Sequence, residues 1–306
     1  MSHDTALCLG AVVYRLSAEG MRLAHEADPA YRPFLLAEPL PAAAADAVSV
    51  RFALSPSPSG DGRTIFRSSA SWTILAEGSR RAFLFRLPDG EPLYVARFRP
   101  GDPEVSVLCS KQLVETRAGA TVLSSPFAYP LDQVLTMYLL TGRGLILHAA
   151  GALVRGKGIL FAGVSGAGKS TITGLAAGRS GWELLSDDRV IVRLEDGAAT
   201  VHGTPWSGEG RVAENRSGAL EWLVFLAQGD GNTVVRLQPA QALARLLKTA
   251  SVPWYDEEYL GAALDTCGRL VRQVPAALLT FRPDAGAVDA VEGLLADRLA
   301  PNTARL

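Results

Sequence analysis

Residues 163–171 read Gly163-Val164-Ser165-Gly166-Ala167-Gly168-Lys169-Ser170-Thr171. The first eight match the pattern G-x-x-x-x-G-K-[ST] of loops that bind phosphate groups. Such a loop needs glycine because its backbone N–H groups turn inward around a polyphosphate, which leaves no room for a Cβ atom. The pattern predicts a nucleotide site, with Lys169 at the β- and γ-phosphates and Ser170 at a Mg²⁺ ion.

The residues on both sides of this loop agree with that prediction. Residues 158–162 form an apolar run typical of a buried strand, and residues 171–177 can continue as a helix. The N-terminus of that helix would point its dipole at the bound anion. Strand, glycine loop and helix therefore come in the order that a nucleotide site requires. The alternative is a turn of small residues that fits the pattern by chance.

Two adjacent carboxylates, Asp187 and Asp188, stand within the run from Gly181 to Val192. Because adjacent residues of an extended chain point in opposite directions, the two should have different roles. One is expected at the metal ion or its water shell, and the other beside an acceptor hydroxyl as a general base. A plain surface turn between two strands is the alternative.

Two further residues are weaker candidates. His148 lies in an apolar run, residues 145–154, that we expect to pair antiparallel with the strand before the loop, so it should lie near the phosphates. A lone histidine in such a strand is more often a core residue. Glu209, in the glycine-rich segment 202–210, is a candidate for the metal shell or a residue of an ordinary turn.

Composition limits the classes of partner. The 306 residues suffice for two ordinary domains. A net charge of -1 gives no reason to expect nucleic acid or an anionic membrane as partner. The three cysteines are far apart, and no apolar run is long enough to span a bilayer. Since the N-terminus also lacks the positive charge of a signal peptide, a cytoplasmic location is expected.

Alternation and periodicity predict a β-rich domain over residues 1–129 and an α/β domain over residues 130–306. Strands are expected over residues 6–16, 48–54, 72–76, 81–87, 93–99, 220–226, 233–237 and 278–281. Helices are expected over residues 130–141, 239–248 and 285–299. The three strands between residues 72 and 99 should form a meander.

The order and spacing of His148, residues 163–170 and the Asp187-Asp188 pair resemble the C-terminal kinase domain of HPr kinase/phosphorylase. The likeness covers about residues 145–192. It implies a fold related to phosphoenolpyruvate carboxykinase, with ATP and Mg²⁺ as cofactors and transfer of the γ-phosphate to a serine hydroxyl of a protein. It also implies active-site roles for His148, Lys169, Ser170 and both aspartates. We assign Asp188 as the base and Asp187 to Mg²⁺, or the reverse, and expect a possible homo-oligomer because the family forms hexamers.

Two parts of the chain depart from the HPr enzymes: residues 202–210 stand where those enzymes carry a glycine-containing signature, and the N-terminal half has no likeness to them. Residues 147–151 and the loop at residues 202–210 look more like the HPr-kinase-related proteins encoded with lasso peptides, which phosphorylate a peptide. We therefore expect a peptide or small protein as acceptor, with the N-terminal domain either capturing it or serving as a structural cap. A kinase of free serine and a nucleotide-dependent regulatory module without catalysis are the alternatives.

Overall fold

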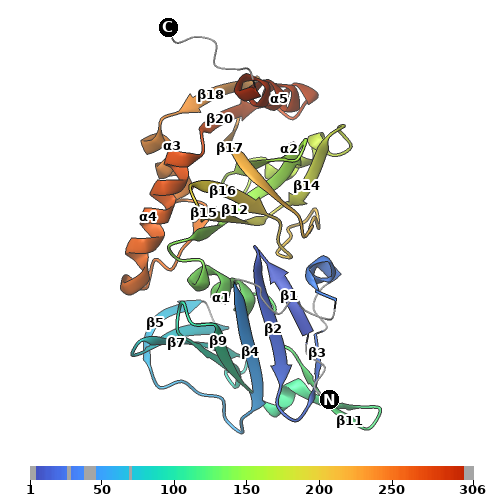
Figure 1. Ribbon diagram of the computed structural model, residues 1–306, viewed down its shortest axis with the longest axis vertical. Helices are drawn as coiled ribbons and strands as arrows, with labels where there is room; N and C mark the ends of the chain where they lie inside the picture. The colour runs from blue at the N-terminus through green and yellow to red at the C-terminus, as the bar shows by residue number, and fades with distance from the viewer. Residues whose placement is uncertain (1–4, 26–28, 38–45, 69–70, 300–306) are drawn as a thin grey trace. The chain divides into compact units, whose positions relative to one another are not determined.

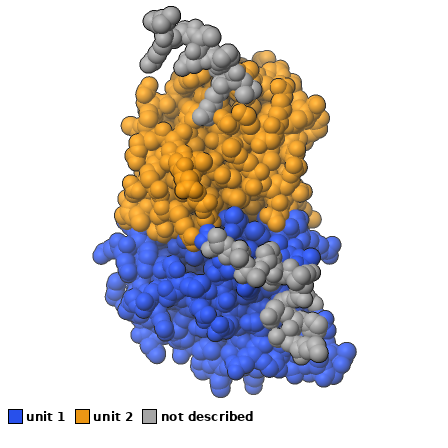
Figure 2. Space-filling view, in the orientation of Figure 1, with its two compact units in different colours: residues 1–139, 253–260 blue, residues 140–252, 261–306 orange. Residues whose placement is uncertain are grey.

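The computed structural model describes residues 5–25, 29–37, 46–68 and 71–299, which form a mixed α/β fold with several sheets and few helices (Figure 1). The chain divides into two compact units, coloured blue and orange in Figure 2. Unit 1 comprises residues 1–139 and 253–260, and unit 2 comprises residues 140–252 and 261–306. None of the described helices is long and apolar enough to cross a membrane.

Unit 1 is β-rich, as predicted. Its larger sheet has the strand order β1-β2-β4-β9-β8-β7-β6-β5, and a smaller sheet has the order β10-β11-β3. The strands are β1 Thr5–Leu9, β2 Val12–Ala18, β3 Arg22–Ala24, β4 Ala47–Leu54, β5 Arg63–Ser68, β6 Trp72–Glu77, β7 Arg80–Arg86, β8 Pro92–Phe98, β9 Glu104–Cys109, β10 Val114–Arg117 and β11 Ala120–Ser124. The described helical segments are η1 Pro29–Phe34, η2 Lys111–Leu113 and α1 Leu131–Leu139. The predicted meander is confirmed, since β6, β7 and β8 pair antiparallel in sequence order.

The helix α1 explains where the first unit ends. Two contacts join this helix to the sheet of unit 1: Tyr138 packs edge-on against Phe98, and Thr136 is hydrogen-bonded to Tyr14 at 2.7 Å. The boundary at residues 139 and 140 therefore comes one helix later than the expected boundary at residues 129 and 130. The short segment of residues 253–260 also belongs to unit 1, which no feature of the sequence suggested.

One predicted strand, residues 6–16, is in fact a hairpin. The strands β1 and β2 pair antiparallel, with Leu9 opposite Val12, so the turn consists of Gly10 and Ala11. Both turn residues have positive φ, 57° and 63°, as a tight turn of the type I′ family requires. Alanine is rare at such a position because its Cβ is strained there, and the sequence therefore gave little warning of the turn.

Unit 2 is built on a nine-stranded sheet. Its strands are β12 Gly144–Val154, β13 Lys157–Ala162, β14 Trp182–Ser186, β15 Arg189–Glu195, β16 Ala198–His202, β17 Ser217–Gln228, β18 Thr233–Leu237, β19 Ala250–Ser251 and β20 Ala276–Phe281. Its helices are α2 Lys169–Ala176, α3 Pro239–Leu246, α4 Glu257–Gln273, which begins in unit 1, and α5 Ala285–Leu299. The main order is β13-β12-β15-β16-β17-β20-β18, and β13 also pairs with β17, so five of the strands form a closed ring of pairings.

The long strand β12 joins two parts of this sheet. Its first half, residues 144–148, pairs with β15, and residues 149–154 pair with β13. The expected antiparallel pairing around the turn at residues 155–156 is thus confirmed. Two apolar clusters cover the sheet: α3 and α4 contribute to one, and α2 and α5 contribute to the other. The sheet is therefore packed against helices on both sides, which fixes the strand ends that carry the candidate site.

The helix α4, the longest in the described chain, was not predicted. Its buried residues are Ala263, Thr266, Cys267, Gly268, Leu270 and Val271, which recur at the three- and four-residue spacing of a helix face. Gly261 and Gly268 lie inside this helix, and glycine has a low helix propensity, which costs stability. Packing of the apolar face against the sheet outweighs that cost. This stabilisation comes from tertiary contacts, which local helix propensity does not predict.

Candidate functional site

Strand register brings His148 to the glycine loop. Ala149 of β12 lies opposite Ala162, the last residue of β13, so His148 stands one position beyond the end of that strand. On its other side His148 pairs with Arg189, the first residue of β15. The turn that carries Asp187 and Asp188 immediately precedes Arg189. Three segments distant in sequence therefore meet where the glycine loop leaves β13.

The glycine loop, residues 163–170, is shaped by close approaches that only glycine permits. A Cβ on Gly163 would lie 2.6 Å from the Cβ of Ala167. Gly168 has a φ of +101°, and a Cβ there would lie 2.6 Å from the Phe281 ring of β20. Gln228, at the end of β17, donates from Nε2 to the Gly166 carbonyl at 2.7 Å. The loop thus leans on the ends of two neighbouring strands.

Lys169 begins helix α2 and turns back over the loop. Its Nζ donates to the carbonyl oxygens of Gly163 at 2.9 Å and Val164 at 3.4 Å. The side chain is nearly buried, and burial lowers its pKa, while the negative charge of Asp188 acts in the opposite direction. The ammonium group therefore lies within the electrostatic reach of Asp188, in the same site.

Asp188 is held from two sides. Its Oδ1 lies 2.9 Å from Nε2 of His148, and its Oδ2 accepts a hydrogen bond from the Arg189 guanidinium. The hydrogen bond with His148 lowers the pKa of the carboxyl most, burial opposes it, and the charges of Arg189 and Lys169 lower it further. Asp188 is consequently a partly exposed carboxylate that stays ionised at neutral pH.

Asp187 has different partners from Asp188, and both residues lie in the turn between β14 and β15 and not in an extended strand. Its Oδ1 accepts backbone N–H bonds from Gly208 at 2.9 Å and Val212 at 3.3 Å, and its Oδ2 accepts one from Gly210 at 2.6 Å. The residue is 7% exposed. Both oxygens are occupied by the loop at residues 204–212, so the structure gives Asp187 an anchoring role that the sequence did not suggest. Its assignment to Mg²⁺ stays a prediction.

The other predicted metal ligands, Glu209 and Ser170, are both exposed. Glu209 lies at the tip of the anchored loop, and Ser170 lies in the first turn of α2. Among the residues that the structure describes, no group of three His, Cys, Asp or Glu side chains is arranged to hold a metal ion. The hydroxyl of Ser170 has no hydrogen-bond partner among the described residues. It is therefore available to a ligand.

Two residues of the site were missed from the sequence. Arg189 holds the second oxygen of Asp188, and its own carbonyl accepts a 2.5 Å hydrogen bond from the buried hydroxyl of Thr204. The only signal for Arg189 was its position directly after the two aspartates. Thr204 fixes the start of the loop that Asp187 anchors, since its Oγ1 also accepts from the Trp206 N–H at 3.3 Å. Threonine is common in turns, so the sequence did not indicate that Thr204 holds the loop in this way.

A family model described as "SynChlorMet cassette protein ScmC" matches residues 131–280, a range that contains the glycine loop, His148 and both aspartates. No curated protein matches the chain. Among solved structures, the Hpr(Ser) kinase/phosphatase from Coxiella burnetii matches with a TM-score of 0.31 and 9% sequence identity, covering 51% of this chain and 99% of that one. A structural likeness with a TM-score of 0.31 supports no conclusion about the function of this chain.

Proposed function

We propose that the glycine loop binds the phosphates of ATP and that the protein transfers the γ-phosphate to a serine hydroxyl of a peptide or small protein. The observation that carries the proposal is the meeting of Lys169 with the His148–Asp188 pair at the end of β13. A phosphate-binding cation and a hydrogen-bonded carboxylate base are the two protein groups that such a transfer needs at one place.

The loop has the features of a phosphate cradle. Backbone N–H groups in the first turn of α2, at residues 169–171, have no acceptor earlier in the helix, and the helix dipole favours an anion there. Nζ of Lys169 donates to two loop carbonyls, and a phosphate oxygen would be a stronger, charged acceptor for the same ammonium group. A Cβ at Gly163 or Gly168 would disturb this shape.

For Mg²⁺ the chain offers the free hydroxyl of Ser170, at the start of the same helix. When bound, the ion would neutralise charge on the phosphates. The carboxylates of Asp187 and Glu209 are further candidate ligands of the ion, as predicted from the sequence. Asp187 would have to serve the ion while it keeps its three N–H bonds to residues 208–212, which a carboxylate with four lone pairs can do.

Asp188 is proposed as the group that accepts the proton of the attacking hydroxyl. Its lowered pKa keeps it ionised at neutral pH, as an acceptor must be. His148 and Arg189 hold one oxygen each, which orients the carboxylate before the acceptor arrives. His148 is thus proposed as a positioning residue, with Lys169 binding the transferred group. Catalysis would consist mainly of positioning and charge neutralisation.

The test is label transfer from γ-labelled ATP with Mg²⁺ to three acceptors: a pool of serine-containing peptides, a cytosolic extract and free serine. Wild-type protein is compared with Asp188→Asn and Lys169→Ala, and with Lys248→Ala as a control at an exposed lysine of unit 2. We expect label on peptide or protein with the wild type and the control, and a loss of at least about 100-fold in both site variants.

Other outcomes change the proposal in defined ways. Label on free serine alone would replace the peptide acceptor by the amino acid. Saturable ATP binding with no label on any acceptor would replace the kinase by a nucleotide-dependent regulatory module. Unchanged transfer in Lys169→Ala would overturn the assignment of the site itself.

A further inference from the structure

The sheet of unit 2 ends in a strand whose outer side is open. β18 pairs with β20 over its whole length and with no other strand among the described residues. The register is regular from Thr233 to Leu237, without a bulge. Val235, in the middle of the strand, is 58% exposed. Because an end strand presents backbone N–H and C=O groups on its outer side, β18 can accept a further strand.

The end strands of the larger sheet in unit 1 are protected against such an addition. At β1 the backbone N–H of Leu36 donates to the Ala6 carbonyl at 2.9 Å, so a neighbouring segment covers part of that edge. At β5 the register shifts after Thr64, and the side chains of Arg63 and Arg67 are exposed. Covering segments, bulges and exposed charges are common means of keeping sheet edges apart. The edge at β18 has neither a bulge nor a cover among the described strands.

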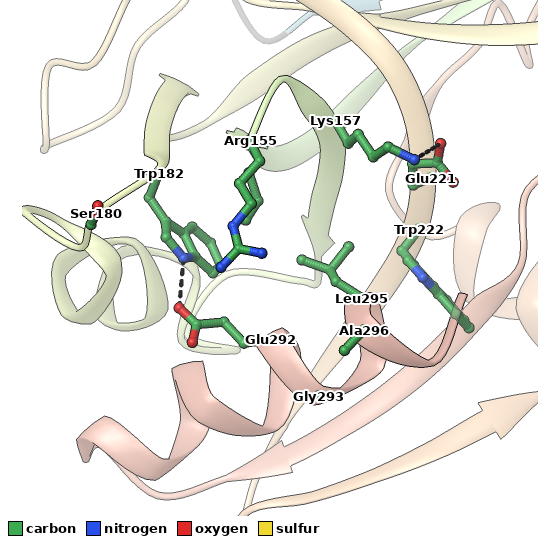
Figure 3. A pocket seen from close by; sticks show the side chains of 11 residues that line it. Arg155, Lys157, Ser180, Trp182, Glu221, Trp222, Glu292, Gly293, Leu295 and Ala296 are labelled. Carbon is green, nitrogen blue, oxygen red and sulfur yellow. Dashed lines mark hydrogen bonds and ion pairs between the residues drawn. The ribbon is translucent and has the colours of Figure 1, made fainter. Parts of the chain in front are cut away.

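The single charged side chain of β18 does not guard its edge. The guanidinium of Arg236 lies over the ring of Trp222 in β17, 5.2 Å from the ring centroid. Trp222 stands in the wall of a cavity of about 360 Å³, on the face of the sheet that α5 covers (Figure 3). Since β20 lies between β17 and β18, the side chain of Arg236 runs across the face of the sheet and not outward from its edge.

The sequence of β18 fits an antiparallel copy of itself. With Val235 opposite Val235 of a second copy, Thr233 lies opposite Leu237, and Val234 lies opposite Arg236. The two arginines do not face each other in this register, so no like charges meet. Three of the five residues are β-branched and favour extended pairing. The chain has a net charge of -1, so two copies repel each other little.

We propose that β18 pairs with β18 of a second copy of the chain and joins the two nine-stranded sheets into one. A strand that pairs with its own copy is related to it by a twofold axis, so the assembly closes as a dimer. Five residues from each copy make a small contact, for which we expect a dissociation constant on the order of 10–100 μM. None of the residues proposed for phosphate transfer lies in β18, so this proposal does not depend on the proposed function.

The first test is a disulfide across the twofold axis. Opposite Cα atoms of an antiparallel pair lie about 4.5–5.5 Å apart, within reach of a disulfide. Val235→Cys should therefore form a covalent dimer under mild oxidation, seen on a non-reducing gel. Thr233→Cys is the matched control, because its two copies would lie about 13 Å apart, too far for a disulfide. We expect at least about tenfold more dimer from Val235→Cys. Equal yields from the two variants would overturn the proposed register.

The second test measures the dimer without a cross-link, by sedimentation of the wild type from about 1 to 200 μM. Val235→Lys should weaken association at least about tenfold, because two ammonium groups would face each other. Leu264→Lys, at an exposed apolar side chain of α4 in the same unit, should leave association unchanged. A wild type that stays monomeric throughout would overturn the proposal. If Val235→Lys then also loses label transfer to peptides, the edge belongs to the acceptor and not to a second copy.

Discussion

Nε2 of His148 and Oδ1 of Asp188 lie 2.9 Å apart, although the two residues are 40 positions apart in the sequence. The pair joins the middle of β12 to the turn between β14 and β15. Because His148 stands one position beyond the end of β13, the pair lies where the glycine loop begins. The hydrogen bond is also the largest influence on the pKa of Asp188, which it lowers.

This relationship predicts the pH dependence of transfer. Asp188 should stay ionised to below its ordinary pKa of 3.8, so that it sets no acid limb on the transfer rate near neutrality. In His148→Ala the hydrogen bond is lost, and the pKa of Asp188 should rise. The acid limb of the pH–rate profile should then move to higher pH, with the rate at pH 7 reduced about tenfold by lost positioning. An unmoved acid limb would show that Asp188 is not the base.

Asp187→Asn distinguishes anchoring from metal binding. An amide has only one acceptor oxygen, so at least one of the N–H groups of Gly208, Gly210 and Val212 would lose its partner. We expect a loss of about 1–3 kcal/mol in the free energy of unfolding and faster hydrogen exchange at these three amides. Normal exchange with an abolished response to Mg²⁺ would instead favour the metal role predicted from the sequence.

The sequence predicted the parts of this site that depend on local pattern. The glycine loop and its flanking strand and helix follow from residue type and periodicity. The partner of Asp187 did not follow, because a carboxylate beside a metal and one that anchors a loop look the same in sequence. The N–H donors at residues 208–212 are backbone groups, which carry no sequence signature.

A similar limit applied to the fold. Long periodic segments such as β12 and α5 were predicted with nearly correct bounds. The hairpin at Gly10 and Ala11 was missed because the turn places an alanine at positive φ, which only the pairing of β1 with β2 stabilises. Residues 253–260 belong to unit 1, where Asp256 forms a buried ion pair with Arg81 at a separation of 175 positions, and pairing over that distance has no local signal.

Gly168, which caps the N-terminus of α2, and Gly174, within that helix, should respond oppositely to alanine. Gly168 has a φ of +101°, and a Cβ there would meet the Phe281 ring at 2.6 Å. Gly168→Ala should therefore lower the free energy of unfolding by about 2 kcal/mol and weaken ATP binding. At Gly174, within the helix, a Cβ meets nothing within 4 Å, so Gly174→Ala should stabilise the protein by about 0.5–1 kcal/mol. Urea unfolding and ATP titration measure both; equal effects would contradict the described loop conformation.

His202, at the end of β16, should make stability depend on pH. Burial lowers the pKa of this imidazole from 6.5 to about 4, the charge of Arg193 acts in the same direction, and Glu195 opposes it. Because the folded state favours the neutral form, this contribution is complete above about pH 6.5 and is lost as pH falls toward 4. We expect a fall of about 2–3 kcal/mol in the free energy of unfolding across that window. In His202→Gln the fall should be smaller by that amount; identical pH profiles would contradict it.

The pair Arg81–Asp256 should stabilise unit 1 far more than a surface pair does. The two side chains are 3% and 4% exposed and lie 2.6 Å apart, and Tyr138 also donates to Asp256 at 2.8 Å. Asp256→Ala leaves a buried arginine with only the half-exposed Glu258 as an acidic partner, which should cost about 3–5 kcal/mol.

The matched control for that change is an arginine–glutamate pair in the same unit. Arg51 and Glu104 lie 2.9 Å apart but are 65% and 58% exposed, so Glu104→Ala should cost less than about 1 kcal/mol. Urea unfolding at pH 7, followed by the fluorescence of Trp254 next to the buried pair in sequence, compares the two variants. Replacing Arg81 and Asp256 together by Met and Leu should recover much of the loss, because no unpaired charge then remains buried. A double variant as unstable as Asp256→Ala would show that the lost packing, and not the uncompensated arginine, causes the loss.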